Sequence, residues 1–501
     1  MIVRLFLPCV LAFTALTGTS CANPKIAQSA PPAMPAQAPV IVVPNPIIAA
    51  PLASAGTLHL EAEAATLTEN TILTKRPGFS GKGYVGGFEK DGAKIVWSRS
   101  AAKAGLYDAR IRYSAPFGVK GYDLAINGAK LSGTFPATGE KFASHSAGKV
   151  ELKAGQNSVE IDRGWGYFDI DALDLVPVAA AKALAAVPEK LADPLASPEA
   201  RALLHRLISS YGKQTLSGQY EAKDSAYVKS VTGKTPAIYG GDLIEYSPSR
   251  VAHGSKPSGT TEAIIAEAKA GRIITLSWHW NAPTGLIDGM LPAGKDGKPV
   301  DARWYKGFNS NATTFDFSKA LDAPASPEHA LLLRDIDTIA VELQKLSDAH
   351  VPVLWRPLHE AAGGWFWWGA HGPEPYKKLW RLMFDRLTGT HHLHNLIWVD
   401  CSGTDPAWYP GSDVVDVVVV DEYPADVTDP LSSHWEDLKT RFDGKKLLAL
   451  TEFGGVPDTD KMRRYGVQWS YFVSWTGGVG PHKMTPEALK RIYGSSAVGN
   501  R

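Results

Sequence analysis

The C-terminal three-fifths of the chain repeats one pattern, in which a short apolar run rich in β-branched residues is followed by a segment with helical spacing of apolar positions. This alternation of strands and helices is typical of α/β proteins with a parallel sheet. Eight candidate strands can be counted in residues 194–501, at 214–218, 237–240, 272–278, 352–356, 396–400, 415–420, 447–451 and 471–475. Eight parallel strands close a (β/α)8 TIM barrel, so we expect that fold for residues 194–501.

Three of the expected helices begin with the same signature. Each has Ser or Thr, then Pro, then Glu, starting at Ser197, Ser326 and Thr485. The hydroxyl can cap the helix, proline suits the first helical position, and the acid favours the positive end of the helix dipole. The helix after Ser326 also carries an apolar stripe for packing on the barrel, at Leu332, Ile336, Ile339, Leu343 and Leu346.

Residues 57–178 have a different character. Short alternating runs occur at 58–64, 95–97, 107–113, 122–128, 149–152, 158–161 and 168–176, with turn signals at 127–128 and 154–157. This spacing predicts a small β-sandwich of jelly-roll type. An Ala-rich segment at 179–193 would link the sandwich to the barrel, and the Pro- and Ala-rich residues 23–56 form a second linker.

Residues 1–22 are typical of a secretion signal, with Arg4, an apolar core at 5–16 and a small-residue cleavage site at Ser20-Cys21-Ala22. We therefore expect a secreted, periplasmic or cell-surface protein, with a lipid anchor at Cys21 as an alternative. The mature chain would keep one thiol, Cys401, which we expect to be buried and inert. No later run is long enough to span a membrane, and a net charge of +1 gives no indication of a nucleic-acid partner.

Two of the expected strands end in a glutamate. Glu360 follows the run 352–356, and Glu452 follows the run 447–451. Active sites of (β/α)8 barrels lie at the carboxyl ends of the strands, and glycoside cleavage ordinarily needs a pair of carboxyl groups. The aromatic segment 365–368, behind a glycine pair, offers apolar faces for sugar rings. A glutamate at a strand end can also be a structural ion-pair partner, but two such strands beside an aromatic loop favour a sugar-cleaving site.

The motifs WRPLHE, GGWFWWG and TEFG resemble those of glycoside hydrolase family 26, which consists mainly of retaining β-mannanases on a (β/α)8 barrel. The resemblance implies that Glu360 is the general acid/base and Glu452 the nucleophile. It also implies that Tyr423 orients the nucleophile, and it makes His359, which precedes the acid/base, a further member of the catalytic group.

The segment WHW at 278–280 also resembles the family and implies that His279 and Trp280 line the sugar cleft. Further candidate substrate-binding residues are Trp365 in the aromatic loop and Asp421 and Trp475 at strand ends. Each also has a packing interpretation. Asp242 stands at the end of the second expected strand. Glu422 is a third acid near the nucleophile, and strand alternation should turn it away from Asp421. The three histidines between residues 391 and 394 have no ligand spacing, so we expect an exposed loop there rather than a metal site.

The sandwich segments LEAEAA, GYVGGF, AGLYDARIRY and GWGYFDIDALDL resemble carbohydrate-binding modules of family 35. That resemblance implies a structural calcium ion held by Glu61, Glu63 and Asp171, and hard carboxylate oxygens suit calcium. Without the resemblance, the two glutamates would be a solvated strand face. Trp165 and Tyr167, in a loop flanked by glycines, are candidate sugar platforms, with a place in the core as the alternative for Trp165.

Together these features predict a secreted endo-β-1,4-mannanase that hydrolyses mannan, glucomannan or galactomannan by a retaining double displacement. We expect catalysis without a cofactor, a mannan-type polysaccharide as the partner, and a monomer. The alternatives are a β-1,3-1,4-glucanase or β-1,3-xylanase of the same family and, outside the enzymes, a polysaccharide-binding protein.

Overall fold

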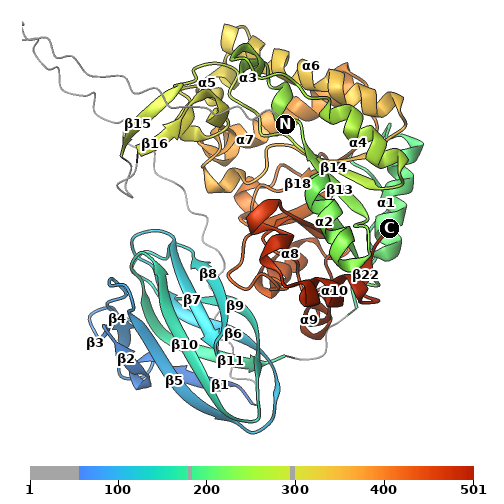
Figure 1. The fold of residues 1–501 in the computed structure, drawn as a ribbon. Coiled ribbons are helices and arrows are strands. Elements are labelled where there is room, and N and C mark those ends of the chain that lie inside the picture. Colours follow the sequence, from blue (N-terminus) through green and yellow to red (C-terminus); the bar gives the residue numbers. More distant parts are fainter. Residues whose placement is uncertain (1–55, 179–182, 294–298) are drawn as a thin grey trace, which may run out of the picture. The chain divides into compact units, whose positions relative to one another are not determined.

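The computed structural model describes residues 56–178, 183–293 and 299–501 (Figure 1). The predicted signal peptide and all but the last residue of the N-terminal linker therefore lie outside the described residues. Among the helices that are described, none is both long and apolar enough to cross a membrane.

The N-terminal module is a sandwich of two antiparallel sheets, which confirms the predicted architecture. One sheet has the order β3-β4-β11-β6-β9, with β1 paired to β11, and the other has the order β2-β5-β10-β7-β8. The strands are β1 (Leu58–Glu61), β2 (Thr66–Thr68), β3 (Thr71–Leu73), β4 (Tyr84–Gly86), β5 (Lys94–Ala101), β6 (Gly105–Ser114), β7 (Lys120–Ile126), β8 (Ala129–Phe135), β9 (Ala143–Leu152), β10 (Gly155–Trp165) and β11 (Asp169–Pro177).

Two details of the module differ from the prediction. The first strand stops at Glu61, because residues 62–64 form a 3-10 turn that the alternating sequence did not reveal. Strand β8 was missed, since its outward positions carry small and polar residues while Phe135 alone is fully buried. The predicted turn before β8 is present, with Asn127 and Gly128 both at positive φ (51° and 86°), as a tight hairpin requires.

The C-terminal domain is the predicted (β/α)8 barrel. All eight predicted strands are present, with parallel pairing in the order β13-β14-β17-β18-β19-β20-β21-β12, and β12 pairs with β13 to close the ring. They are β12 (Thr215–Tyr220), β13 (Ile238–Asp242), β14 (Ile273–Ser277), β17 (Val353–Arg356), β18 (Leu396–Asp400), β19 (Val417–Glu422), β20 (Leu447–Phe453) and β21 (Tyr471–Ser474). A hairpin of β15 (Gly289–Ala293) and β16 (Pro299–Ala302) follows β14, and β22 (Val498–Gly499) pairs with β12.

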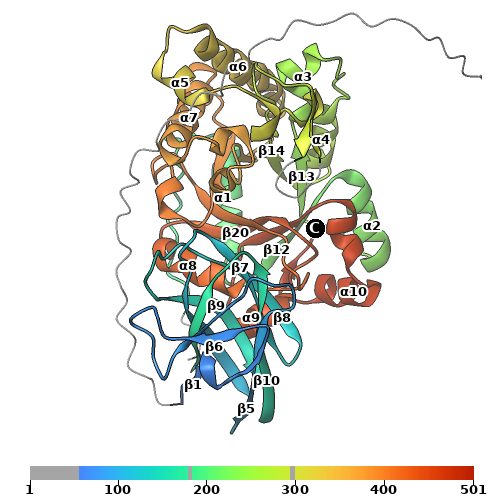
Figure 2. The same ribbon diagram turned by 90° about the vertical axis from the view of Figure 1, so that its left-hand side faces the viewer.

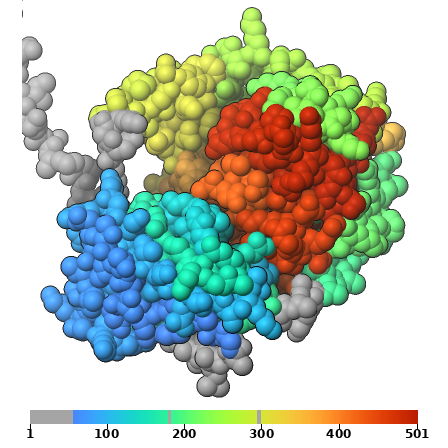
Figure 3. All heavy atoms as spheres, turned by 60° about the horizontal axis from the view of Figure 1, so that its bottom comes forward, coloured from blue at the N-terminus to red at the C-terminus, as the bar shows by residue number. Residues whose placement is uncertain are grey.

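Helices surround the barrel strands on the outside (Figures 1 and 2). They are α1 (Pro198–Ser210), α2 (Ala222–Thr232), α3 (Pro248–Ala252), α4 (Thr260–Lys269), α5 (Phe317–Asp322), α6 (Pro327–Asp348), α7 (Pro373–Asp385), α8 (Ser432–Phe442), α9 (Thr459–Tyr465) and α10 (Pro486–Gly494). The three predicted caps are confirmed, since Ser197, Ser326 and Thr485 each accept a backbone N–H from the first turn. The last helix packs against α2, and Figure 3 shows the C-terminal residues (red) beside early barrel residues (green).

The alternation along each strand separates two apolar layers. On β17, Val353 and Trp355 belong to the layer between the strands and the helices, whereas Leu354 belongs to the layer inside the barrel. Side chains at the next inward positions toward the carboxyl end leave this inner layer and form the floor of a site. Arg356 is the inward residue after Leu354 and is completely buried.

Two residues of α6 allow a matched test of this packing. Leu343 is fully buried against the strands, while Val341 on the same helix is 60% exposed. We expect Leu343→Ala to lower the free energy of unfolding of the barrel by about 2 to 5 kcal/mol, because it removes buried methyl groups and leaves a cavity. Val341→Ala should change it by less than about 0.5 kcal/mol. Urea unfolding followed by tryptophan fluorescence measures both, and equal effects would contradict the assigned orientation of α6.

Candidate active site

The site residues come mainly from the inward positions at the carboxyl ends of the strands. Continuing the inward series of each strand reaches Tyr220 on β12, Asp242 on β13, Arg356 on β17, Asp421 on β19 and Trp475 after β21. Residues from six of the eight strands meet in this way once Glu452 on β20 is added. Strand alternation, which the sequence largely determines, and closure of the barrel therefore bring together groups that lie up to 255 residues apart in the chain, as for Tyr220 and Trp475.

Glu452 reaches the site through an irregularity in β20. Leu448 and Leu450 point to the outer layer, so a regular strand would also direct Glu452 outward. The pairing with β19 shifts register here: Val420 pairs with Leu450, but Asp421 pairs with Glu452. The extra residue is a bulge, which turns Glu452 into the barrel, where it is 3% exposed. Bulges re-aim side chains in this manner next to active sites.

Glu360 lies on the loop after β17, in a conformation that is unusual for its residue type. Leu358 and Glu360 both have positive φ, of 50° and 54°. The loop is fixed to the end of β18, because Glu360 N–H donates to Cys401 O (2.5 Å) and Ala362 N–H donates to Ser402 O (2.9 Å). A left-handed glutamate is maintained only when its surroundings fix it, and such strained residues cluster at functional sites.

Three carboxyl groups meet at the floor of the site. One oxygen each from Glu360, Asp421 and Glu452 lies within 4.8 Å of the other two, and this is the only such acidic or metal-ligating cluster in the described part of the chain. The guanidinium of Arg356 donates to Asp421 Oδ2 (2.5 Å) and to Glu452 Oε1. Tyr423 O–H donates to the other oxygen of Glu452 (2.9 Å). Glu452 and Asp421 are therefore paired with a cation, whereas Glu360 has no cationic partner among the described residues.

This difference in partners gives Glu360 and Glu452 different tendencies to hold a proton. Burial, with the nearby charges of Asp421 and Glu452, raises the pKa of Glu360 to about 8. Burial also raises the pKa of Glu452, but the Arg356 guanidinium opposes that shift and hydrogen-bonds to the ionised form. Burial and the neighbouring carboxylates raise the pKa of Tyr423, so its phenol stays a neutral donor. These partners thus favour a proton on Glu360 and, by comparison, the ionised form of Glu452.

Trp365 forms one exposed wall beside this pair. Its indole is 52% exposed, and its Nε1–H donates to Glu360 Oε2 (2.8 Å). The ring lies flat over Gly363, where a Cβ atom would come within 2.1 Å of it. A side chain at position 363 would therefore clash with the ring, and glycine leaves the space that the ring occupies. Trp475 is partly buried on the opposite strand and packs edge-on against Tyr220, with ring centroids 4.7 Å apart.

The prediction that Trp280 lines the sugar cleft is wrong. Trp280 is fully buried in the outer layer, stacked on Trp278 at 4.3 Å, and its indole N–H donates to Asp335. The reason is the strand alternation: Trp278 and Trp280 lie on the same side, and His279 between them faces the site. Trp280 supports the site from behind, since its carbonyl accepts the indole N–H of Trp367 (2.6 Å).

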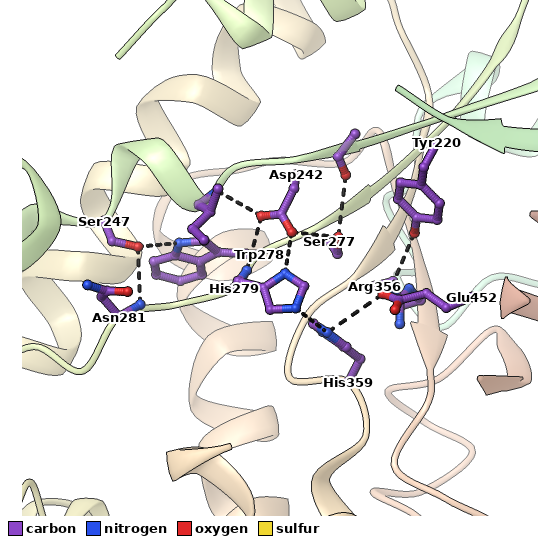
Figure 4. A network of polar contacts seen from close by, with 12 residues as sticks. Tyr220, Asp242, Ser247, Ser277, Trp278, His279, Asn281, Arg356, His359 and Glu452 are labelled. Atoms are coloured by element: carbon purple, nitrogen blue, oxygen red, sulfur yellow. Dashed lines mark hydrogen bonds and ion pairs between the residues drawn. The ribbon is translucent and has the colours of Figure 1, made fainter. Parts of the chain in front are cut away.

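Two histidines complete the floor (Figure 4). His279 Nδ1 contacts Asp242 Oδ2, and its Nε2 lies 3.2 Å from Nε2 of His359. His359 is completely buried and its Nε2 lies 3.8 Å from Glu452 Oε1. Burial, together with Arg356, lowers the pKa of His359 well below its ordinary value, so this imidazole is neutral. Burial works to lower the pKa of His279, but the Asp242 carboxylate more than offsets it and the pKa is raised.

The remaining predicted residues lie as follows. Glu422 turns outward, 3.6 Å from His434 on α8. Two of the histidines before β18 have aspartate partners: His391 contacts Asp337, and His394 contacts Asp193. The expected buried thiol, Cys401, is 3% exposed.

In the module, Trp165 is 52% exposed, which excludes the alternative that it belongs to the core. Its indole lies over Gly121, and the neighbouring Tyr167 packs near Phe117, with ring centroids 5.7 Å apart. Phe117 is 71% exposed and was not identified from the sequence, although its place between two short strands is a signal for a loop aromatic.

The predicted calcium ligands lie around the loop of Ser80 and Gly81. A Cβ on Gly81 would lie 2.2 Å from Glu63 Oε1 and 3.0 Å from Glu61 Oε1, so both carboxylates converge on this point. Ser80 Oγ lies 2.8 Å from Glu61 Oε2 and 3.1 Å from Asp171 Oδ2. Glu63 Oε2 is buried without a hydrogen-bond partner in the structure, an acceptor that a hard cation would satisfy. Asp171 differs from the two glutamates because Arg112 is already paired with it.

Sequence reasoning did not assign roles to Arg356, Tyr220, Asp242 and Thr451. Arg356 donates to two carboxylates, Tyr220 O–H lies 3.1 Å from Arg356 Nη2, and Thr451 O–H donates to Asp421 (2.6 Å). The alternation of inward and outward side chains along each strand places these residues in the site, and this alternation can be read from the sequence. Their partners depend on which strands are neighbours, which follows only from barrel closure.

A closed (β/α)8 barrel with paired carboxyl groups and aromatic walls at the carboxyl ends of its strands defines a glycoside hydrolase. The chain belongs to glycosyl hydrolase family 26: the model of that family matches residues 192–501, and the model of the family 35 carbohydrate binding modules matches residues 58–178. Both family resemblances inferred from sequence motifs are thereby confirmed.

Known proteins share both parts of the chain. A mannan endo-1,4-beta-mannosidase of Thermothelomyces thermophilus is 42% identical over 87% of this chain and 88% of its own length. A mannan endo-1,4-beta-mannosidase A of a Piromyces species is 32% identical over 83% of this chain and 67% of its own. The crystal structure of a Podospora anserina GH26-CBM35 β-(1,4)-mannanase superposes with a TM-score of 0.62 and 41% identity, covering 89% of this chain and 98% of that one.

The hydrogen bond from Trp365 to Glu360 allows a test of the proton distribution. The Glu360 carboxyl should titrate near pH 8, and Trp365→Phe should raise its pKa further, because the indole N–H stabilises the ionised form. Carbon NMR of glutamate-labelled protein measures the titration, with Glu360→Gln to assign the signal. Trp165→Phe, in the module, is the control and should leave the pKa unchanged. A Glu360 pKa near that of a free glutamate would contradict the assignment.

Proposed function

We propose that the chain is an endo-1,4-β-mannosidase that cleaves mannan, glucomannan or galactomannan with retention of anomeric configuration. The observation that supports it most strongly is the acidic pair: Glu360 and Glu452 have oxygens within 4.8 Å, close to the separation of about 5 to 5.5 Å that suits a retaining mechanism and too short for an inverting one. The sugar specificity rests on relatives named as mannanases, which share both parts of the chain.

In the first step, Glu360 acts as the general acid and Glu452 as the nucleophile. The proton that burial holds on Glu360 passes to the glycosidic oxygen, while an ionised Glu452 oxygen attacks the anomeric carbon and forms a glycosyl ester. Arg356 and Tyr423 each bind one oxygen of Glu452, so the carboxylate is aimed before substrate arrives. Departure of the leaving sugar takes the proton and leaves Glu360 ionised.

In the second step, ionised Glu360 takes a proton from water, and the hydroxide attacks the anomeric carbon of the ester. Glu452 leaves as a carboxylate and recovers its bonds to Arg356 and Tyr423. The cycle returns both carboxyl groups to their starting states. Besides water, the proposed steps use only side chains of this chain, so the proposal calls for no cofactor in catalysis.

Aromatic and polar side chains around the pair support sugar binding. Trp365 and Trp475 offer apolar faces on two sides of the floor, and pyranose rings pack on such faces. His279, His359 and Asp421 supply polar groups between them, which suits hydroxyl recognition. We place the central sugar ring over this floor.

A β-1,3-1,4-glucanase or β-1,3-xylanase would use the same carboxyl pair, so product analysis decides between these activities. A binding protein without activity has no support, because both carboxyl groups are present and have the partners that catalysis needs.

We also propose that the module binds the polysaccharide at Trp165 and holds a structural calcium ion. Glu61 and Glu63 converge on one point and leave a buried oxygen unpartnered, which supports them as ligands. Asp171, on the other side of Ser80, would complete the site while Arg112 balances part of its charge.

The proposed location is outside the cell or on its surface, and it rests on the signal pattern with Arg4 and the Ser20-Cys21-Ala22 site. A lipid anchor at Cys21 is the alternative. A monomer is proposed because one chain supplies every residue of the site.

The direct test is product analysis with the purified chain. It should release short manno-oligosaccharides from glucomannan or galactomannan, and Glu452→Ala should lower the rate by several orders of magnitude, because the atom that forms the ester is lost. Strong release from lichenan or β-1,3-xylan, with none from mannan, would contradict the substrate proposal.

Azide separates the two roles in the same assay. With Glu452→Ala and an aryl mannoside, azide should enter on the nucleophile's face and give a product of inverted configuration. With Glu360→Ala, the first step survives for a good leaving group, and azide should give a product of retained configuration. Exchange of the two outcomes would reverse the assigned roles.

The calcium proposal predicts a metal-dependent stability. A chelator should lower the melting temperature of the module's transition in the full chain and calcium should restore it, since a ligand at 100 times its Kd stabilises the folded state by about 2.7 kcal/mol. Glu63→Gln should abolish this response. Glu69→Gln, at an exposed ion pair with Lys90 in the same module, is the control and should retain it. A chelator-insensitive wild-type melting curve would refute the site.

A further inference from the structure

Asp242, at the end of β13, has no assigned role in the reaction, and both of its oxygens are occupied. Oδ1 accepts two backbone N–H groups, from Ile244 (2.8 Å) and His279 (3.1 Å). Oδ2 faces the His279 ring nitrogen Nδ1 and the hydroxyl of Ser277 (3.2 Å). One oxygen therefore holds the backbone of two loops, and the other faces a side chain of the site (Figure 4).

The walls around His279 do not by themselves fix which nitrogen faces the site. Phe308 and Phe366 pack edge-on against the imidazole, at 5.1 and 5.5 Å between centroids, and Trp475 lies 6.3 Å away. These contacts set the plane of the ring. A half-turn about the Cβ–Cγ bond would keep the same plane and exchange carbon and nitrogen positions, so a polar partner must select one orientation. Asp242 is that partner, and it requires a proton on Nδ1 because a carboxylate only accepts.

The partner of the other nitrogen is His359. Its Nδ1 is buried with no hydrogen-bond partner among the described residues, and an unpaired buried N–H is rare and costly. The proton of neutral His359 therefore resides on Nε2, the atom 3.2 Å from His279 Nε2. His279 must then present a lone pair at Nε2, and the neutral tautomer with its proton on Nδ1 meets both this requirement and that of Asp242. The hydrogen bonds run in one direction, from His359 to His279 to Asp242.

We propose that Asp242 is a positioning residue that acts through His279: it fixes the ring and its Nδ1–H tautomer, and thereby directs the N–H of His359 away from the nucleophile. The proposal rests on the function proposed above for Glu452. His359 Nε2 also lies 3.8 Å from Glu452 Oε1, which is longer than a hydrogen bond, so a small shift of the ring would make this oxygen a second acceptor for its proton. When His279 accepts the hydrogen bond from His359, that N–H does not compete for the Glu452 oxygen, whose lone pair remains available to attack the anomeric carbon.

The other charged groups near the two imidazoles do not replace Asp242. Arg356 is directed at Asp421 and Glu452, and it presents only donors to the site. Glu360 accepts the indole N–H of Trp365 and is not bonded to either imidazole in the described part of the chain. Among the described residues, Asp242 is the carboxylate bonded to the outer nitrogen of His279.

The test is Asp242→Asn in the full chain. The amide oxygen can replace Oδ1 toward the two backbone N–H groups, which directs the NH2 group at His279 Nδ1. That nitrogen must then accept, the proton moves to Nε2, and two N–H groups face each other across the histidine pair. We expect nitrogen NMR of labelled histidine to show the reversed tautomer of His279, and kcat/KM on a soluble manno-oligosaccharide to fall by about 10- to 100-fold.

Two comparisons separate positioning from a structural effect. Asp416→Asn changes another buried aspartate, one that precedes β19 at the opposite end of the barrel and accepts only backbone N–H groups from Ala192 and Trp398. It should leave the tautomer and kcat/KM unchanged, whatever its effect on stability. In a His279→Gln background, Asp242→Asn should cost less than about twofold, because the residue it acts through is gone.

An unaltered His279 tautomer in Asp242→Asn, or an equal loss of activity with and without His279, would overturn the proposal. If Asp242→Asn does not fold, Ser277→Ala, which removes one donor to Oδ2, should shift the same NMR signals by less. The tautomer is read without substrate, so a wild-type chain inactive on mannan would refute the proposed function and leave this result standing.

Discussion

The buried guanidinium of Arg356 is the interaction on which the site depends. It lies fully inside the barrel and donates to Asp421 and Glu452, so two carboxylates share one buried cation. Removing one partner from a buried ion pair typically costs about 3 to 5 kcal/mol, because the remaining charge stays unpaired. Arg356 does not bond to Glu360, and no other cation of residues 56–178, 183–293 and 299–501 forms an ion pair with it. The difference between the two glutamates is thus set by which of them Arg356 reaches.

Two departures from regular backbone place the reacting groups. The bulge in β20 rotates Glu452 into the barrel, and the left-handed conformation at Glu360 turns the loop after β17 toward it. Both are maintained by surrounding bonds, since Cys401 O accepts the Glu360 N–H and the neighbouring strands hold the bulge on both sides. The barrel supplies a rigid frame, and the strained segments provide the short carboxyl separation that the frame alone would not give.

Strand parity explains which sequence predictions succeeded. The eight strands, the helix caps and the two carboxyl groups followed from apolar runs and capping residues, which are local signals. Trp280 was misplaced because its motif was interpreted without alternation: His279 faces inward, so Trp278 and Trp280 on either side of it must face the helices. Strand β8 was missed because its outer positions carry no apolar signal. The roles of Arg356 and Asp242 could not be assigned, because their partners come from other strands.

The sequence by itself determined the class of fold, the family and the pair of glutamates, because hydrophobic periodicity and short motifs are written along the chain. Only the tertiary structure decided how the carboxyl groups share protons, which histidine nitrogen faces which partner, and that Glu452 points inward at all. Those properties depend on burial and on distances between strands that are remote in sequence. Barrel closure creates these distances, and no single segment of the chain contains them.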